Sequence, residues 1–405
     1  MVSRRRRGAA TLRRDGAAAL GARPAGRRRR PLTARTKGFD LVTTTPHAGA
    51  VPDSATGEAF TWPDLLTSLV AGNDLDSATT SWAMDQVMSG EVSPVRLASF
   101  LVALRAKGET VDELTGLADS MLAHASRFTV DGPAVDIVGT GGDRAHTVNV
   151  STMAAVVVAG TGTLVVKHGN RAATSSSGSA DVLEALGLRL DHGAGRVAQI
   201  ADEVGITFCP AMVFHPSMRH AGAARKELGI PTAFNVLGPL TNPAQPPASA
   251  IGVADARMAP LIAGVLARRG VSALVFRGDD GLDELAATSS ATIWEVRAGV
   301  VAEHHLDPVQ DLGLAPITVT DLRGADAAHN AEVVHRVLAG QTGPVRETVL
   351  LNAAAGLVAD GRLPGTGDGP LVERLRAGYG LAARSIDTGA ARDVLDRWVA
   401  AAARD

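Results

Sequence analysis

Two segments in the middle of the chain contain the residue types that bind phosphate. The first, Gly-Thr-Gly-Gly-Asp at 139–143, directly follows the apolar run 135–138. Glycines after a strand let backbone N–H groups converge on an anion without interference from side chains. The second, Asn-Val-Ser-Thr at 149–152, stands just before the apolar run 153–159. Ser and Thr favour the N-cap of a helix, where free N–H groups and the helix dipole attract phosphate.

A third segment, Lys-His-Gly-Asn-Arg-Ala-Ala-Thr-Ser at 167–175, adds cations and hydroxyl groups, and further serines follow it up to Ser179. Together the three segments suit a heavily phosphorylated small molecule. The common nucleotide fingerprints do not fit. The dinucleotide loop and the P-loop both require glycine at 144, where Arg144 stands, and the P-loop requires lysine at 145, where Ala145 stands. The segments therefore predict a phosphate site of another kind.

A group of acidic residues follows the apolar run 273–276. The stretch 278–284 reads GDDGLDE, which places four carboxylates within six residues. Mg²⁺ takes carboxylate and phosphate oxygens together with water. The cluster therefore predicts a site for a hard cation at the end of a strand. An acidic surface turn is the alternative, and it is the more frequent explanation for such a cluster taken alone.

A further constellation contains His-Pro-Ser-Met-Arg at 215–219, then Arg225, then FNVLGPLTNP at 234–243. In this order, the motifs together resemble the anthranilate phosphoribosyltransferase family, whose fold is shared with the pyrimidine nucleoside phosphorylases. The resemblance runs from about Thr61 to the C-terminus, and its discriminating string is KHGN at 167–170. It implies transfer of a 5-phosphoribosyl group from phosphoribosyl diphosphate to anthranilate, in tryptophan synthesis. A nucleoside phosphorylase-like enzyme of the same fold and a non-catalytic nucleic-acid binder are the alternatives.

The resemblance also implies which residues bind the donor and the metal. It implies two Mg²⁺ ions per active site, with Asp283, Glu284 and the Ser151 hydroxyl as ligands. The implied donor-binding residues are Gly139, Gly142, Asp143, Thr147, Asn149, Val150, Ser151, Thr152, Lys167, His168, Gly169, Asn170, Arg171, Ala172, Ala173, Thr174, Ser175 and Ser179.

The acceptor site is implied in the same way. Gly139, Asn170 and Arg225 match positions that touch anthranilate, and His168 and His215 are two further candidates. A planar, two-pronged cation such as Arg225 suits the carboxylate of the acceptor. The alternative role for His215 is to cap the helix that follows it.

No residue is predicted to act as a general acid or base. The nitrogen of an aryl amine is already neutral at pH 7, and the sequence shows no Ser-His-Asp or Cys-His pattern. Lys167, Asn170 and Arg225 are instead expected to contribute charge and orientation.

The spacing of apolar residues predicts an α/β protein with a small N-terminal helical domain. Four amphipathic helices come first, one beginning near Thr61 and the others at 77–88, 94–106 and 111–123. After Pro133, helices alternate with short strands expected at 135–138, 164–166, 248–253 and 273–276, and a strand or two are expected around 292–301. The larger domain should therefore contain a central, mostly parallel sheet flanked by helices.

Three regions are expected along the chain. They are a disordered Arg-rich extension at 1–59, a small helical domain at 60–130, and an α/β domain at 131–405 that binds phosphoribosyl diphosphate. A helical segment near 190–230 is expected to pack on the small domain.

Charge is unevenly distributed along the chain. Residues 1–38 contain 13 Arg or Lys and one acid, whereas the remainder contains 27 basic and 41 acidic residues. The tail is therefore basic and the body acidic, and the composition of the tail predicts disorder. Nucleic-acid binding and organellar targeting are alternative roles for the tail. An extension without function, or a start codon assigned too early, is the favoured interpretation.

The remaining features concern location and partners. Cys209 is the only cysteine, which excludes an intramolecular disulfide and favours a reduced cytoplasm. The longest apolar stretch, 153–166, is interrupted by two glycines and is too short to span a bilayer. The resemblance implies a homodimer, and neither a membrane nor a nucleic acid is an expected partner.

Overall fold

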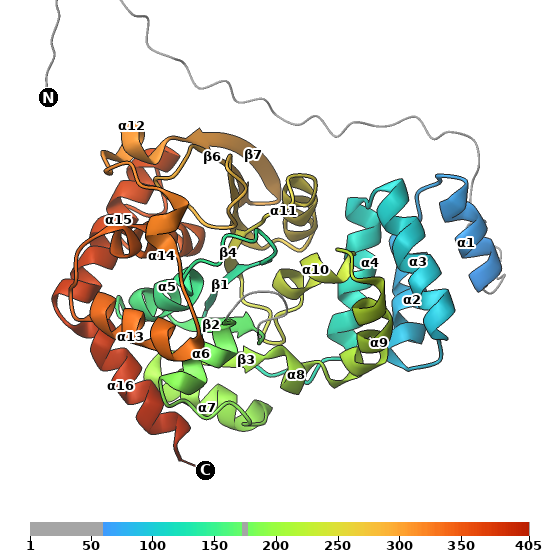
Figure 1. Ribbon diagram of the computed structural model, residues 1–405, viewed down its shortest axis with the longest axis horizontal. Helices are drawn as coiled ribbons and strands as arrows, with labels where there is room; N and C mark the ends of the chain where they lie inside the picture. The colour runs from blue at the N-terminus through green and yellow to red at the C-terminus, as the bar shows by residue number, and fades with distance from the viewer. Residues whose placement is uncertain (1–59, 172–176, 405) are drawn as a thin grey trace, which may run out of the picture. The chain divides into compact units, whose positions relative to one another are not determined.

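The computed structural model describes residues 60–171 and 177–404 (Figure 1). The predicted extension at 1–59 and four predicted donor-binding residues, Ala172, Ala173, Thr174 and Ser175, lie outside the described residues. In the described part a group of four helices comes first and an α/β region follows. No helix of this part is both long and apolar enough to cross a membrane.

Each of the first four helices begins at a side chain that caps its first turn. Thr61, Asp76, Ser93 and Thr110 each accept the backbone N–H of the residue three positions later. Glu113 accepts in return from the Thr110 N–H, which completes a capping box. The helices lie close to the predicted ranges, at α1 Trp62–Val70, α2 Ser77–Met88, α3 Pro94–Lys107 and α4 Val111–Ala123.

The α/β region is built on a seven-stranded sheet in the order β3-β2-β1-β4-β5-β6-β7. The first five strands are parallel, and β6 and β7 run antiparallel to their neighbours. The strands are β1 Val135–Gly139, β2 Val165–Gly169, β3 Ile206–Pro210, β4 Ala248–Gly252, β5 Ser272–Gly278, β6 Ala291–Arg297 and β7 Val300–Leu306. The predicted fold class is confirmed.

One strand, β3, was not among the predicted strands. It follows a helix after a single residue, Gly205, and all five of its residues are buried. A short apolar run beside a helix cannot be distinguished from the end of that helix by periodicity.

Both faces of the sheet are covered. Successive strand residues point to opposite sides, so neighbouring residues lie in different cores. Ile137 and Leu274 lie in a core formed with α5, α14 and the C-terminal helices. Val138 and Val275 lie in a second core shared with α11 and the first four helices. Helix α11 (Met258–Arg268) contacts both β5 and α4, so it joins the helical bundle to the sheet.

The remaining helices complete these layers. The segment expected near 190–230 divides: α9 packs on α2 and α3, whereas α7 packs on β3 and α16. The helices are α5 Val150–Ala159, α6 Ser179–Ala185, α7 Ala194–Val204, α8 Ala211–Phe214, α9 Arg219–Leu228, α10 Phe234–Leu237, α11 Met258–Arg268, α12 Pro308–Leu312, α13 Ala327–Leu338, α14 Pro344–Asp360, α15 Leu371–Asp387 and α16 Ala390–Ala402.

Candidate active site

The glycine-rich loop leaves the end of β1 beside the end of β4, where Gly139 pairs with Gly252. Both positions need glycine because the acidic turn, which comprises residues 278–284, packs against them. A Cβ on Gly252 would lie 1.6 Å from the backbone oxygen of Asp283, and a Cβ on Gly139 would lie 2.3 Å from its carboxylate. Gly141 and Gly142 have positive φ angles of 66° and 89°, which glycine adopts without strain. The Gly141 N–H donates to Asp283 Oδ2 at 2.7 Å, so loop and turn form one site.

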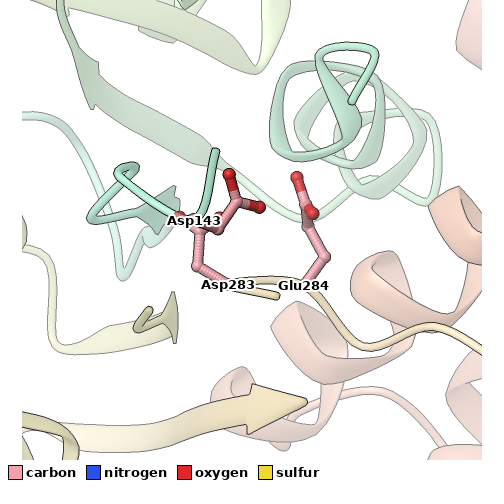
Figure 2. A group of neighbouring side chains, drawn as sticks. All are labelled: Asp143, Asp283 and Glu284. Carbon is pink, nitrogen blue, oxygen red and sulfur yellow. The ribbon is translucent and has the colours of Figure 1, made fainter. Parts of the chain in front are cut away.

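Three carboxylates meet where the loop and the turn join. Asp143, Asp283 and Glu284 each place an oxygen within 4.8 Å of the others (Figure 2). Burial, reinforced by the negative charge of Asp143, raises the pKa of Asp283 to about 7. Burial and the charge of Asp283 raise the pKa of Glu284 well above its usual value. The three groups therefore strongly favour a neutralising cation or proton.

This set of oxygens suits a divalent cation. Glu284 Oε2 and Asp143 Oδ2 are buried and have no hydrogen-bond partner within the described ranges. Hard oxygen ligands of this kind bind Mg²⁺. Asp143, which was predicted only for the donor site, thus lies with the predicted ligands Asp283 and Glu284. Asp280 instead accepts from Thr288 Oγ1 at 2.6 Å and belongs to the turn.

Lys167 lies inside the sheet rather than at the surface of the loops. Its side chain is buried, and Nζ donates to the Ile137 carbonyl and, at 3.1 Å, to Ser151 Oγ. Burial lowers the pKa of Lys167 to about 8 and raises that of neighbouring Asp136 to about 6, while each charge favours the other. Asn242 Nδ2 also donates to Asp136, at 2.9 Å. Lys167 therefore orients Ser151, and a direct contact with the donor stays a prediction.

The start of α5 differs from the predicted cap. Its N-cap is Asn149, whose side chain caps none of the helix N–H groups. The Asn149 carboxamide instead donates to the Ser177 carbonyl at 3.1 Å and accepts from Asn330 at 2.8 Å. Val150 and Thr152 are buried in the first turn. Asn330 was missed because a single asparagine outside any motif gives no sequence signal.

The third phosphate segment is described as far as Arg171. Asn170 is exposed, and its Oδ1 accepts from the Arg171 N–H at 2.8 Å. The Arg171 guanidinium pairs with Glu184 at 2.6 Å, so its charge is directed to α6. Ser179 begins that helix.

The two arginines of the later motif have different surroundings. Arg219 is exposed and donates to the Pro216 carbonyl at 3.1 Å. Arg225 lies over the ring of Phe234, with 5.0 Å from Cζ to the ring centroid, and burial lowers its pKa. No carboxylate among the described residues pairs with it. A partly buried, unpaired guanidinium is suited to an anionic ligand.

The two candidate histidines lie against each other, with ring centroids 5.2 Å apart. His168 Nδ1 is 3.0 Å from the Gly238 carbonyl, and His215 Nε2 is 2.9 Å from the Thr241 carbonyl. Burial lowers the pKa of His168 to about 3 and also lowers that of His215. Both rings are therefore neutral at pH 7, and each keeps a buried nitrogen that accepts no hydrogen bond from a described residue.

A cleft of about 320 Å³ adjoins the glycine-rich loop. The loop residues 140–143 line one part of it, and Thr232 and Asn235 line another. Arg105 of α3 also lines the cleft and donates to Asp255 at 2.7 Å. Arg105 was not predicted, because only the packing of the helical bundle brings it there.

Comparison with known proteins identifies the family. Residues 63–125 match the glycosyl transferase family, helical bundle domain, and residues 131–392 match its a/b domain. Anthranilate phosphoribosyltransferases of Arthrobacter sp. (strain FB24) and Streptomyces griseus are both 60% identical to the chain. The two matches cover 86% and 85% of this chain, and 97% and 96% of the relatives. The chain belongs to the anthranilate phosphoribosyltransferase family.

Solved structures of anthranilate phosphoribosyltransferases have the same fold. The Thermus thermophilus enzyme superposes with a TM-score of 0.78 at 39% identity, covering 84% of this chain and 99% of that one. The Saccharomyces cerevisiae enzyme in complex with PRPP and Mg superposes with a TM-score of 0.75 at 27% identity, covering 87% and 99%. The family inferred from the sequence motifs is therefore confirmed.

Stability should depend on pH through His168. Its pKa is depressed to about 3 in the folded protein, whereas an unfolded histidine takes up a proton near pH 6.5. The unfolded state thus binds more protons as pH falls below 6.5, and stability falls with it. When the pH falls from 7 to 5, the free energy of unfolding should decrease in both proteins. The decrease should be about 2 kcal/mol smaller in the His168→Asn variant than in the native protein.

Urea midpoints at pH 5 and pH 7 would measure this difference. His305→Asn is the control, because His305 is exposed on β7. An identical pH dependence in native protein and His168→Asn would contradict the neutral, buried state of His168.

Proposed function

We propose that this chain transfers the 5-phosphoribosyl group of phosphoribosyl diphosphate to the nitrogen of anthranilate and releases diphosphate. The reaction is a step of tryptophan biosynthesis. The observation that carries the proposal is the meeting of the glycine-rich loop with Asp143, Asp283 and Glu284 at the ends of β1 and β4. A polyanion that arrives with its cations makes use of both a glycine-rich backbone loop and clustered carboxylates.

The donor is held by charge and by backbone dipoles. The glycine-rich loop and the N-terminus of α5 direct N–H groups at the diphosphate, and Lys167 orients the Ser151 hydroxyl beside them. We assign Asp283, Glu284 and Asp143 to one Mg²⁺ and Ser151 to a second. Mg²⁺, when bound, neutralises charge on the departing diphosphate. Charges placed in advance around the leaving group lower the barrier without reorganisation.

The acceptor is held by its carboxylate and its amine. Arg225 is the proposed partner of the carboxylate, since it is partly desolvated and unpaired with any described acid. The neutral rings of His168 and His215 offer lone pairs to the amine N–H groups, and Asn170 and Gly139 complete the contact. No strong base is needed, because the attacking nitrogen is already uncharged. Support for this acceptor comes from the yeast relative, solved in complex with 4-fluoroanthranilate.

Anthranilate fluorescence provides the test. Purified protein incubated with phosphoribosyl diphosphate and Mg²⁺ should consume the fluorophore, and omission of either should prevent it. An unchanged signal at saturating concentrations would overturn the proposal. Phosphorolysis of thymidine in a parallel reaction would instead indicate the nucleoside phosphorylase alternative.

We also propose that the protein is a homodimer joined through its helical bundle. Val95 and Val102 are 75% and 41% exposed on α3, and a spacing of seven places them on one face. Val70 is 80% exposed on α1, which packs on α3. Exposed apolar side chains on adjacent helices favour burial against a second subunit.

Sedimentation should therefore show a native dimer and a largely monomeric Val95→Asp/Val102→Asp variant. Val300→Asp on β7, where the valine is 65% exposed, is the control and should stay dimeric. A monomeric native protein would contradict the proposed subunit contact.

A cytoplasmic location accords with this function. Cys209 is fully buried, and burial raises the pKa of its thiol well above the usual value. The single cysteine therefore fills space in the core and requires no oxidising compartment.

A further inference from the structure

Asn352 makes an unusual contact with the acidic turn. It lies on α14, is 2% exposed, and is 67 residues from Leu285 along the chain. Leu285 directly follows the two carboxylates Asp283 and Glu284. The Leu285 N–H donates to Asn352 Oδ1 at 3.1 Å, and Asn352 Nδ2 donates to the Leu285 carbonyl at 2.8 Å. One side chain thus satisfies both backbone groups of the residue that follows the carboxylates.

The turn needs such a restraint because its carboxylates repel one another. Asp143, Asp283 and Glu284 lie within 4.8 Å in a partly buried setting, where repulsion between ionised groups is less screened than in water. The Asp283 backbone also lies close against Gly252. Without a hold on Leu285, the turn would relax away from the glycine and spread the carboxylates.

Helix α14 is tightly packed and can therefore anchor the contact between Asn352 and Leu285. Its residues 348–359 are all buried, and the helix packs on α5, α15 and the sheet. Asn352 Nδ2 also donates to the Thr348 carbonyl at 2.8 Å, which fixes the orientation of the carboxamide. A carboxamide can accept from the N–H and donate to the C=O of one residue at the same time.

We propose that Asn352 is a positioning residue for the metal-binding carboxylates. By clamping Leu285 to α14, it keeps Asp283 and Glu284 at the separation that a divalent cation requires. This inference rests on the proposed function, since that function supplies the cation. The competing explanation is that Asn352 only satisfies buried backbone groups, in which case its loss would lower stability and leave cation binding unchanged.

Binding of Mn²⁺ alone, measured by electron paramagnetic resonance on the full chain, separates the two explanations. Removing a group that orients metal ligands typically weakens binding about 10- to 100-fold. Asn352→Ala should therefore raise the Kd for Mn²⁺ by at least about tenfold. Asn352→Gln keeps the carboxamide but displaces it by one methylene, so it should give an intermediate Kd with a smaller loss of stability.

Ser385→Ala is the matched control. Its hydroxyl makes another buried bond from a side chain to a distant carbonyl, to Val157 at 2.8 Å. This variant should lose thermal stability and bind Mn²⁺ like the native protein. A native Kd in Asn352→Ala or in the folded Asn352→Gln variant would overturn the proposal.

Turnover supplies a second readout. The Mg²⁺ concentration for half-maximal rate should rise in Asn352→Ala, and kcat should largely recover at saturating Mg²⁺, because all three carboxylates remain. Native protein that consumes no anthranilate would disprove the proposed function, whereas the difference in Mn²⁺ affinity is measured without turnover. The two failures are thus distinguishable.

Discussion

Replacing Arg225 with alanine should raise the KM for anthranilate about 10- to 100-fold, since hydrogen bonds to charged groups contribute about 1.5–3 kcal/mol. The KM for phosphoribosyl diphosphate should change far less. Arg225 is partly desolvated over Phe234 and lacks an acidic partner in the described part of the chain. Its positive charge is therefore free for the acceptor carboxylate, and the donor is held by other segments.

Steady-state kinetics with each substrate varied in turn would measure this effect. Arg219→Ala is the control, because Arg219 is exposed on the same helix and bonds only a local carbonyl. Arg225→Lys should retain part of the affinity, since it keeps the charge and loses the two-pronged geometry. Equal increases in both KM values would count against the assigned role.

Replacing Glu284 with glutamine should lower kcat by about 100- to 1000-fold, the typical cost of removing one preorganised electrostatic group. The substitution preserves size and removes one of three charges that lie within 4.8 Å. A neutral amide is a poorer ligand for a hard cation. The Mg²⁺ concentration for half-maximal rate should therefore rise as well.

Asp280→Asn is the matched control for Glu284→Gln. Asp280 belongs to the same turn, but it is exposed and accepts from Thr288 within the turn. The control should keep nearly native kinetics with respect to Mg²⁺. Comparable losses in the two variants would show that the turn, rather than the Glu284 charge, was disturbed.

Local chemistry explains why much of the fold was predictable. Caps such as Thr110 and the alternation of Ile137 with Val138 act over a few residues, so the sequence displays them directly. The order of the phosphate and acidic motifs was equally visible and indicated the family. Strand β3 was less visible, because its burial depends on neighbours that are distant in sequence.

The sequence supplied candidate site residues, and it did not predict the contacts that they make in the fold. The donor contact of Lys167 stays a prediction, and the fold shows that its side chain is buried and contacts Ser151. Arg171 was expected at the same site, and its guanidinium pairs with Glu184 on α6. Charge and hydroxyl content predict that a segment meets phosphate, but they do not determine which side chains point inward.

The sequence by itself determined the four N-terminal helices, most strands, the family and the residue types available for phosphate and metal. The tertiary structure alone decided that Asp143 lies beside Asp283 and Glu284. It also decided that Gly252 packs against the acidic turn and that Asn352 hydrogen-bonds the residue that follows it. The reason is distance along the chain. The Gly141–Asp283 bond spans 142 residues and the Asn352–Leu285 bonds span 67, and contacts of that range exist only after the sheet and α14 have packed.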